Sequence, residues 1–571
     1  DAEALWASGR VALRVPIGVA GDGTAVELDI KEAAADGMGP HGLCVGATGS
    51  GKSEFLRTLV LGMIAAHPPD ALNLVLVDSK GGATFRGLEK ARHVSALITN
   101  LADEAPLVSR MREALSGEVH RRQEILWAAG NFVNIAEYQR ARAAGRNLTP
   151  LPALFIIVDE FSELLSQHPD FAELFVAIGR LGRSLGMHLL LASQRLDEGR
   201  LRGLETHLSY RICLKTFSAS ESRAVLGVAD AYHLPTQPGA AYLKTASGDV
   251  TRFQTAFVSG GYTPPPRPPE RVEQVVAELF TFATATSADP VALPVSTAVR
   301  HRSLMDAVLH TLAGRGPAAH RVWLPPLAGS PNLEALLEGT AAHLRVPVGL
   351  VDCPFEQRHE PRTVDLSGAA GNVAVVGAPR SGKSTTLRTL VSSLAATLDA
   401  DAVQFYCLDF GGGGLTALGA LPHVGVVAGR RDADLCRRTV AQLESVLRQR
   451  EAAFRRLGVD SFAEYRAVAE DGYGDVFLVI DGWEQFTEAQ GALDPEGVVD
   501  AVLAILRDGS SVGVVGVVAG GRGLLQPRWS AIGGTTLLLG AVDPLDAALV
   551  GLRLADVPRD PPRGRAVRLA D

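Results

Sequence analysis

GATGSGKS, at residues 46–53, fits the phosphate-loop pattern G-x-x-x-x-G-K-[ST], and GAPRSGKS, at residues 377–384, fits it again. A short apolar run precedes the first loop, and Leu56, Leu59 and Met63 follow it at helical spacing. A strand, a glycine loop and a helix form the arrangement in which backbone N–H groups and a helix N-terminus bind phosphate. A chance glycine turn explains this context poorly, so we predict two phosphate-binding domains.

The two loops belong to a longer internal repeat. Lys383 follows Lys52 by 331 residues, and the same offset relates LRVPIG at residues 13–18 to LRVPVG at residues 344–349. A period of this length indicates duplicated domains rather than a solenoid, whose repeats span about 20–50 residues.

Apolar bursts of strand length recur through the first copy. They lie at residues 42–45, 72–77, 153–158 and 188–192. Runs of this kind are typical of central strands in a parallel sheet, and helical patterns separate them. We therefore predict two tandem α/β domains of the RecA-like P-loop NTPase type, each with a doubly wound sheet. Ligands of such sheets bind at the carboxyl ends of the strands.

A proline-rich segment, TPPPRPP at residues 263–269, separates the two copies. Proline lacks an N–H donor and fixes φ, so this segment is predicted to be a stiff connector, followed by helices at 270–283 and 303–313. The expected parts are a catalytically complete ATPase domain, a proline-rich and helical linker, and a second, degenerate nucleotide-binding domain, at residues 1–260, 261–320 and 321–571.

The composition is that of an ordinary globular chain, with 571 residues, 47% hydrophobic and 21% charged. A formal net charge of −8 argues against a surface built to wrap DNA, although a local basic stripe is compatible with it. Five cysteines without a C-x-x-C pair are predicted to be buried free thiols of a reducing compartment. No apolar stretch approaches the ~18 residues of a membrane helix. Because the chain begins at Asp1 rather than Met, we expect it to be a fragment.

The first loop supplies the groups of a nucleotide site. Its glycines allow a tight turn that points N–H groups at phosphate oxygens. Lys52 brings a catalytic positive charge to the β- and γ-phosphates, and the Ser53 hydroxyl is predicted to bind Mg²⁺. The predicted nucleotide contacts are Gly46, Thr48, Gly49, Ser50, Gly51, Lys52 and Ser53. We therefore expect ATP and Mg²⁺ as ligands.

Two acids follow the apolar run at residues 153–158. Asp159 ends a predicted buried strand, where an unpaired carboxylate is costly, so we expect it to hold the Mg²⁺ shell. Glu160 is placed to orient and deprotonate the water that attacks the γ-phosphate. The alternative interpretation of Glu160 is a helix-capping or surface acid.

The second copy keeps the binding groups and loses the predicted base. Its expected nucleotide contacts are Gly377, Arg380, Ser381, Gly382, Lys383, Ser384 and Thr385, with Ser384 and Asp481 as metal ligands. Gly482 stands where the first copy has Glu160, so we predict tight ATP binding with negligible hydrolysis. Glu484, which follows Trp483, is an alternative base.

Several motifs of the first copy resemble the motor domains of the FtsK/SpoIIIE family. They are the strand that ends in Asp-Glu-Phe at residues 159–161, GRSLGMHL at 182–189 and ASQR at 192–195. The resemblance implies that Gln194 senses the γ-phosphate and that Arg183 reaches into a neighbouring subunit's site as a catalytic arginine finger. Arg180 is the nearest competitor for that role. In the second copy, Gly521 and Ser510 stand at the positions of Gln194 and Arg183.

KGGATF at residues 80–85 and the tandem arrangement resemble, more narrowly, EccC, the ATPase of type VII (ESX) protein secretion. The resemblance implies a hexameric ring of this chain and membrane components of a secretion complex as partners. It also implies small helical-hairpin substrates, recognised through a C-terminal signal. The expected location is the cytoplasmic face of the cell membrane, with this fragment itself soluble and cytoplasmic.

The role of the second copy and the overall activity leave alternatives. The second copy is expected to bind ATP and to regulate the first or to dock partners. An apolar groove on it is a place for a helix, for which residues 270–283 are one candidate. A DNA translocase is the other occupation of this family; the charge and the lack of a basic helix-turn-helix segment disfavour nucleic acid. A scaffold with two structural nucleotides is the third interpretation.

Overall fold

The computed structural model of the chain consists of two compact units, which are residues 1–324 with 354–357, and residues 325–353 with 358–571. The residues that it describes are 6, 13–32, 37–79, 81–99, 105–196, 203–262, 303–327, 329–338, 343–368, 371–469, 472–491, 497–530, 532, 534–540, 543–552 and 561–567. The proline-rich segment 263–269 and the predicted helix 270–283 lie outside this set. The other predicted linker helix is present as α8 (Leu304–Leu312) and belongs to the first unit.

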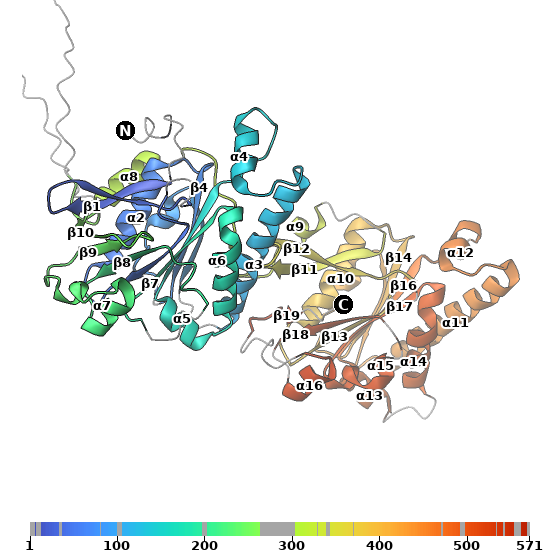
Figure 1. Ribbon diagram of the computed structural model, residues 1–571. Coiled ribbons are helices and arrows are strands. Elements are labelled where there is room, and N and C mark those ends of the chain that lie inside the picture. The colour runs from blue at the N-terminus through green and yellow to red at the C-terminus, as the bar shows by residue number, and fades with distance from the viewer. Residues whose placement is uncertain are drawn as a thin grey trace, which may run out of the picture. The chain divides into compact units, whose positions relative to one another are not determined.

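The first unit is built on a ten-stranded mixed sheet with the order β2-β1-β10-β9-β8-β3-β7-β6-β4-β5 (Figure 1). Its strands are β1 (Arg14–Ala20), β2 (Ala25–Asp29), β3 (His41–Val45), β4 (Leu72–Asp78), β5 (Val94–Thr99), β6 (Ala153–Asp159), β7 (Met187–Ser193), β8 (Tyr210–Leu214), β9 (Ala240–Lys244) and β10 (Val250–Thr255). The run from β8 to β5 is parallel, which confirms the predicted doubly wound sheet. Antiparallel strands extend it beyond β8, a feature that the sequence did not predict.

Helices cover both faces of this sheet. They are α2 (Lys52–Ala66), α3 (Ala105–Ala128), α4 (Ile135–Ala143), α5 (Phe161–Gln167), α6 (Phe171–Leu185), α7 (Ala219–Leu226) and α8. Strands β4, β6 and β7 are buried at every residue, and their alternate side chains enter two separate cores. One core holds side chains of α3 and α6, and the other holds those of α2 and β1. Burial on both faces explains why these strands are continuous apolar runs.

The second unit contains a seven-stranded sheet with the order β15-β14-β16-β17-β13-β18-β19 and a two-stranded sheet, β11-β12. The strands are β11 (Arg345–Cys353), β12 (Arg358–Asp365), β13 (Val373–Gly377), β14 (Val403–Asp409), β15 (Val424–Gly429), β16 (Asp475–Asp481), β17 (Val514–Gly520), β18 (Thr535–Leu539) and β19 (Ala566–Val567). The helices are α9 (Leu333–Leu337), α10 (Lys383–Thr397), α11 (Ala433–Leu457), α12 (Phe462–Val468), α13 (Trp483–Gly491), α14 (Val498–Asp508), α15 (Pro527–Ser530) and α16 (Pro544–Leu549). Among the described helices of either unit, none is both long and apolar enough to cross a bilayer.

The two units share one topology at their centres. The order β5-β4-β6-β7-β3-β8 of the first unit recurs as β15-β14-β16-β17-β13-β18 in the second, with all of these strands parallel. The strand register also recurs, because Asp159 lies beside Ala192 and Asp481 lies beside Ala519. The predicted duplication therefore has a structural counterpart, and the register shows which positions correspond.

The five cysteines are free and buried, as the sequence predicts. Burial raises the pKa of the Cys407 thiol to about 12 and that of Cys436 to about 11. These thiols therefore stay protonated near neutral pH and pack as small apolar side chains.

Candidate functional site

The first phosphate loop joins the carboxyl end of β3 to the N-terminus of α2. Gly49 and Gly51 have φ of 81° and 95°, backbone conformations that favour glycine. A Cβ at Gly46 would lie 2.6 Å from the Ser50 hydroxyl, so this position also requires glycine. The Ser50 Oγ is buried without a partner among the described residues. A phosphate oxygen in the loop would satisfy this hydroxyl, so the loop fits its predicted ligand.

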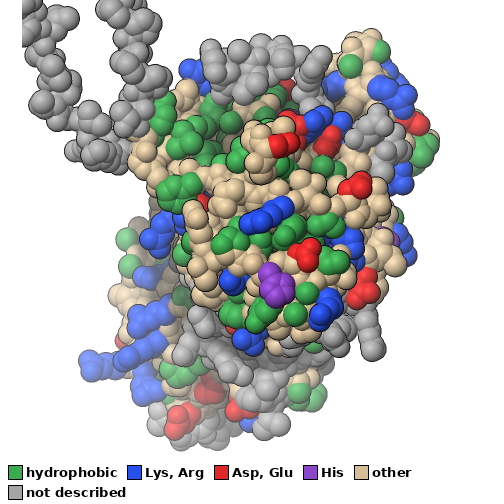
Figure 2. Space-filling view, turned by 60° about the vertical axis from the view of Figure 1, so that its left-hand side comes forward, with side chains coloured by type: hydrophobic (Ala, Val, Ile, Leu, Met, Phe, Trp, Pro, Cys, Tyr) green, Lys and Arg blue, Asp and Glu red, His purple; other side chains and the backbone are tan. Residues whose placement is uncertain are grey.

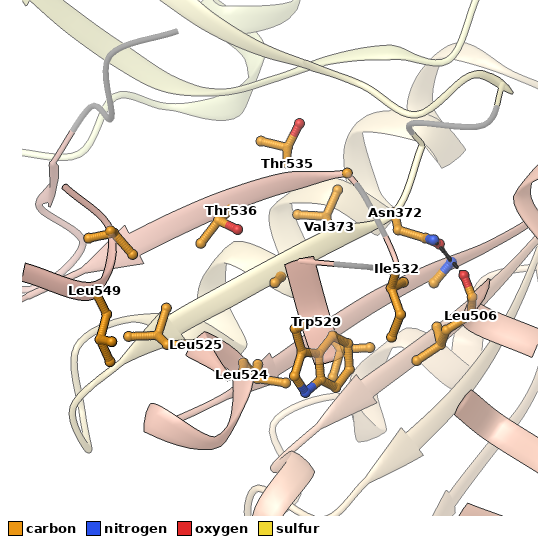
Figure 3. Close-up of a pocket in the computed structure, with 15 residues that line it drawn as sticks. Asn372, Val373, Leu506, Leu524, Leu525, Trp529, Ile532, Thr535, Thr536 and Leu549 are labelled. Atoms are coloured by element: carbon orange, nitrogen blue, oxygen red, sulfur yellow. Dashed lines mark hydrogen bonds between the residues drawn. The ribbon is translucent and has the colours of Figure 1, made fainter. Parts of the chain in front are cut away.

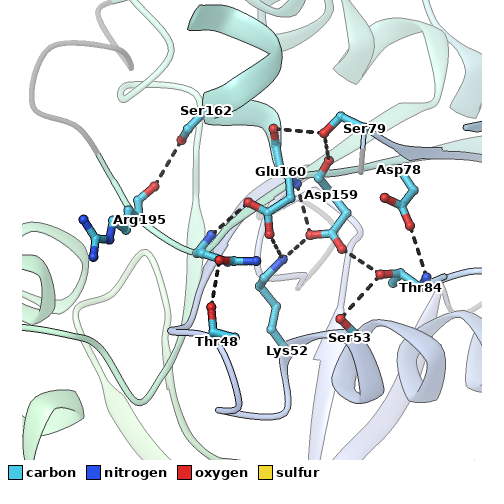
Figure 4. Close-up of polar contacts among 11 residues, drawn as sticks. Thr48, Lys52, Ser53, Asp78, Ser79, Thr84, Asp159, Glu160, Ser162 and Arg195 are labelled. Carbon is cyan, nitrogen blue, oxygen red and sulfur yellow. Dashed lines mark hydrogen bonds and ion pairs between the residues drawn. The ribbon is translucent and has the colours of Figure 1, made fainter. Parts of the chain in front are cut away.

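Lys52 lies buried between the two acids at the end of β6 (Figure 4). Its Nζ contacts Asp159 Oδ1 and donates to Glu160 Oε1 at 2.9 Å. Burial lowers the pKa of Lys52, but the two carboxylates outweigh this effect and raise it above its ordinary value. The amine is therefore charged, and phosphate oxygens that enter the loop compete with the carboxylates for it.

Glu160 has a left-handed backbone, with φ 59° and ψ 41°. Such strain costs about 1–3 kcal/mol and persists where the surroundings impose it. The Ser79 hydroxyl is within hydrogen-bonding distance of the carbonyls of Asp159, at 3.2 Å, and Glu160, at 3.3 Å. The Glu160 N–H donates to Asp159 Oδ1 at 3.0 Å. This turn directs the Glu160 side chain inward, where its Oε2 accepts from the backbone N–H of Gln194 at 3.4 Å.

The burial and contacts of Glu160 argue against a surface acid or a helix-capping side chain. The residue is 6% exposed, and its side chain makes no hydrogen bond that caps α5. A strained, buried carboxylate beside a phosphate-loop lysine is suited to holding a water against the γ-phosphate.

Thr84 fixes the second oxygen of Asp159. Its Oγ1 donates to Asp159 Oδ2 at 2.9 Å and lies 3.4 Å from Ser53 Oγ, while its N–H donates to Asp78 Oδ2 at 3.1 Å. The two predicted metal ligands, Ser53 and Asp159, thus meet around one hydroxyl (Figure 4). Mg²⁺ takes oxygen ligands and shares the phosphates of a nucleotide, so these residues fit the metal.

The sequence interpretation assigned no role to Thr84 or Ser79. Thr84 lies within KGGATF at residues 80–85, the segment that carries the resemblance to EccC. The contacts of Thr84 depend on β4 and β6 lying side by side, and a single sequence does not state that pairing.

Thr84→Val is expected to raise the Mg²⁺ concentration required for half-maximal ATP hydrolysis by about 10-fold, because partners that orient a metal ligand typically contribute 10–100-fold. Valine keeps the shape and removes the hydroxyl. Thr84→Ser, which keeps the hydroxyl, is the matched control and should behave like the unaltered chain. Equal Mg²⁺ dependence for all three proteins would show that Thr84 does not position Asp159.

Gln194 joins the same cluster and Arg183 does not. Thr48 Oγ1 donates to Gln194 Oε1 at 2.9 Å, which brings the predicted phosphate sensor against the loop. Arg183 lies in the last turn of α6, where its Nε donates to Glu32 Oε2 at 2.7 Å. Its side chain is 59% exposed. Arg180, the other candidate finger, is exposed on the same helix.

The second loop repeats the backbone of the first but holds its lysine differently. Gly382, with φ 114°, precedes α10, and Arg380, with φ 63°, adopts the left-handed conformation that Gly49 has in the first loop. Lys383 Nζ donates to the carbonyls of Gly377 and Ala378, at 2.7 and 2.9 Å. Burial lowers the pKa of Lys383.

The second site lacks a carboxylate at the position that Glu160 has in the first. Gly482 has φ 83°, so it keeps the turn of Glu160 without the carboxylate. Asp481 is buried, its pKa is raised chiefly by burial, and its Oδ2 has no partner among the described residues. Leu415 stands where the first unit has Thr84, since its N–H donates to Asp409 Oδ2 at 2.8 Å as that of Thr84 donates to Asp78 Oδ2. Leucine has no hydroxyl to donate to Asp481.

The second loop and the acids beside it line an open cleft of about 1620 Å³ in the second unit. Ser384, Thr385 and Asp481 also lie in its wall. The arginines that line it are Arg380, Arg430, Arg431, Arg522 and Arg563. The Ser381 Oγ is buried without a partner among the described residues, as Ser50 Oγ is in the first unit. The cleft therefore fits a polyanionic ligand such as a nucleoside triphosphate.

Comparison with known proteins places both copies in one family. The sequence profile of the FtsK/SpoIIIE family matches residues 2–198 and 332–525. The ESX-4 secretion system protein EccC4 of Mycobacterium tuberculosis is 56% identical over 98% of this chain and 46% of its own length. The ESX secretion system protein EccC of Thermomonospora curvata is 50% identical over 98% of this chain and 45% of its own. The chain thus spans about half the length of the curated relatives it matches.

A solved structure shows the same fold. The cytoplasmic domain of the Thermomonospora curvata type VII secretion ATPase EccC superposes with a TM-score of 0.86 at 49% identity. The match covers 99% of this chain and 64% of that chain. Two tandem units of the P-loop ATPase type are therefore shared with that protein.

Proposed function

The chain belongs to the FtsK/SpoIIIE family, and with EccC proteins of type VII secretion as its relatives, we propose that it is part of a protein-exporting motor that hydrolyses ATP in its first unit. The observation that carries this proposal is the buried cluster of Lys52, Asp159 and Glu160 beside the phosphate loop. The second unit, in which glycine replaces Glu160, binds ATP and regulates the first unit or docks partners. The hexameric ring, the membrane partners and the cytoplasmic face of the membrane as location are parts of the same proposal.

The first site has a group for each requirement of phosphoryl transfer. Lys52 and the loop N–H groups hold the β- and γ-phosphates, and Glu160 accepts a proton from the attacking water. Ser53 and Asp159 would hold Mg²⁺, which would supply positive charge to the phosphate oxygens. Gln194, tied to the loop through Thr48, is placed to respond to the γ-phosphate.

The second unit has a smaller pocket for a partner, apart from its nucleotide cleft. The pocket has a volume of about 240 Å³ and lies between β13, β18 and the segment around Trp529 (Figure 3). Leu524, Leu525 and Trp529 form one wall, and Leu549, at the rim, is 60% exposed. The buried Trp529 Nε1 has no acceptor among the described residues. Asn372, Thr535 and Thr536 line the pocket together with these apolar side chains, so it offers both kinds of contact to an amphipathic helix. We propose this pocket for a helical substrate or for another segment of the chain.

Single-site variants of the whole chain test whether the first unit hydrolyses ATP and the second binds it. Lys52→Ala is expected to lower steady-state ATP hydrolysis by about 10²-fold, because it removes charge stabilisation at the hydrolysing site. Lys383→Ala is expected to leave most of the hydrolysis and to reduce the number of bound ATP analogues per chain from two to one. Calorimetric titration and phosphate release measure the two quantities. Loss of hydrolysis in Lys383→Ala, with most hydrolysis kept in Lys52→Ala, would refute the proposal.

A DNA translocase is the second candidate of the family, and surface charge disfavours it. Figure 2 shows a face on which basic, acidic and apolar side chains are interspersed, and the net charge is −8. Proteins that grip the phosphate backbone concentrate Lys and Arg along one groove or face. Salt-sensitive binding of duplex DNA together with DNA-stimulated hydrolysis would favour the translocase instead.

A further inference from the structure

A carboxylate occupies the second site although Gly482 has none. Glu484 lies in the first turn of α13, and both of its oxygens lie within hydrogen-bond distance of the Gly521 N–H, at 2.9 and 3.0 Å. Gly521 directly follows β17. The Glu484 side chain therefore reaches from its helix to the carboxyl end of a central strand.

The strand register shows that Glu160 makes the corresponding contact in the first unit. Gln194 comes two residues after Ala192, which pairs with Asp159, and Gly521 comes two residues after the partner of Asp481. Glu160 Oε2 accepts from the N–H of Gln194. Two carboxylates that differ in sequence position thus lie against the same backbone N–H of the shared fold.

Glycines surround the Glu484 carboxylate. A Cβ on Gly520 would lie 3.0 Å from Oε2, and a Cβ on Gly523 would lie 2.9 Å from Oε1. A Cβ on Gly521 would lie 3.4 Å from Oε1. Side chains at Gly520 and Gly523 would displace the carboxylate. The sequence GGRG at residues 520–523 therefore leaves the space that Glu484 fills.

The same carboxylate belongs to the nucleotide cleft. Glu484 lines it together with Lys383, Ser384 and Asp481, and it is close enough to Lys383 to act on that amine electrostatically. The side chain is half-buried, so it is available to a water or a ligand in the cleft.

We propose that Glu484 supplies the second site with the water-orienting carboxylate that Gly482 lacks, so that this site hydrolyses ATP slowly rather than not at all. The inference rests on the proposed binding of ATP by the second unit. It replaces the expectation of negligible turnover there with a slow reaction that depends on one residue.

The reaction is ordinary hydrolysis with the base in a new position. Glu484 accepts a proton from a water whose oxygen bonds to the γ-phosphorus while the bond from that phosphorus to the β–γ bridging oxygen breaks. The electron pair of that bond leaves with ADP, and the proton passes to the phosphate product. Leu415 offers no hydroxyl to Asp481, and Gly521 offers no side chain to the γ-phosphate, so the rate is expected to be low.

The test uses the whole chain with Lys52→Ala to silence the first site, and Lys52→Ala with Lys383→Ala as the background. Adding Glu484→Gln to Lys52→Ala is expected to lower the remaining hydrolysis above background by at least about 10-fold, with unchanged binding of a fluorescent ATP analogue. Glu488→Gln, an exposed acid on the same helix, is the matched control and should have no effect. Gly523→Ala, which keeps the carboxylate but displaces it, should also lower the rate.

The outcomes separate this inference from the proposal beneath it. Nucleotide bound at the second site without hydrolysis above background would overturn the role of Glu484. Hydrolysis that is unchanged by Glu484→Gln would also overturn it. So would hydrolysis that falls only because the variant no longer binds the ATP analogue. If Lys383→Ala does not change nucleotide binding, both the proposed ATP site and this inference fail.

Discussion

Glu160→Gln is expected to lower kcat for ATP hydrolysis by about 10²–10⁴-fold while ATP still binds with near-normal affinity. The amide keeps the size of the side chain and an oxygen that accepts from Lys52, so the fold of the site is preserved. It loses the ability to take a proton from water. The effect should therefore fall on kcat rather than on KM, as for a group that acts mainly in the transition state.

A matched variant separates this chemistry from a general effect of lost charge. Glu173, exposed on α6, provides it, because Glu173→Gln removes one negative charge outside the cluster. Phosphate release and analogue binding should be measured on both variants and on the unaltered chain. Full hydrolysis by Glu160→Gln would show that Glu160 is not the group that takes the proton from water.

The two copies carry different residues at one left-handed turn. Glu160 and Gly482 occupy the same left-handed turn at the end of a central strand. Glycine adopts this conformation without strain, whereas glutamate does not. A strained glutamate at this turn is therefore expected where its side chain has a function. A Cβ at Gly482 would lie 2.9 Å from the Gly411 nitrogen, so the second unit leaves no room for a side chain at this turn.

The central strands, the phosphate loops and the duplication were predictable because each is written in contiguous residues. A buried strand such as β6 is an unbroken apolar run, and a phosphate loop is a fixed spacing of glycine and lysine. The acids that end β4 and β6 were predictable for the same reason. Position at the end of an apolar run, together with rules for parallel sheets, was enough to bring Asp159 to the loop.

Contacts between segments far apart in the chain were not predictable in this way. Thr84 reaches Asp159 across 75 residues, and Glu484 reaches Gly521 across 37. Each contact depends on strand order and on the direction of a side chain at the end of an element. The antiparallel extension beyond β8 has a similar cause, since β1 and β10 come from opposite ends of the first unit.

Arg183→Ala is expected to lower ATP hydrolysis by about 10³-fold or more without loss of ATP binding, as for arginine fingers that complete a neighbour's site. The exposed side chain pairs with Glu32 and lies outside the cluster around Lys52, so within one chain it has no assigned task at the phosphate loop. A neighbouring copy of the chain is the natural recipient of its charge. Hydrolysis per chain should therefore rise with protein concentration, and a monomeric chain should be nearly inactive.

Mixing two inactive variants distinguishes a finger from a surface charge. Chains with Arg183→Ala retain Glu160, and chains with Glu160→Gln retain Arg183, so a mixed ring contains some interfaces in which both groups are intact. Partial recovery of hydrolysis on mixing is expected, and Arg180→Ala should leave hydrolysis unchanged. If the mixture stays inactive while each variant still assembles, Arg183 does not act across the interface. If Arg180→Ala rather than Arg183→Ala is inactive, the finger lies one helical turn earlier, on the same exposed stretch of α6.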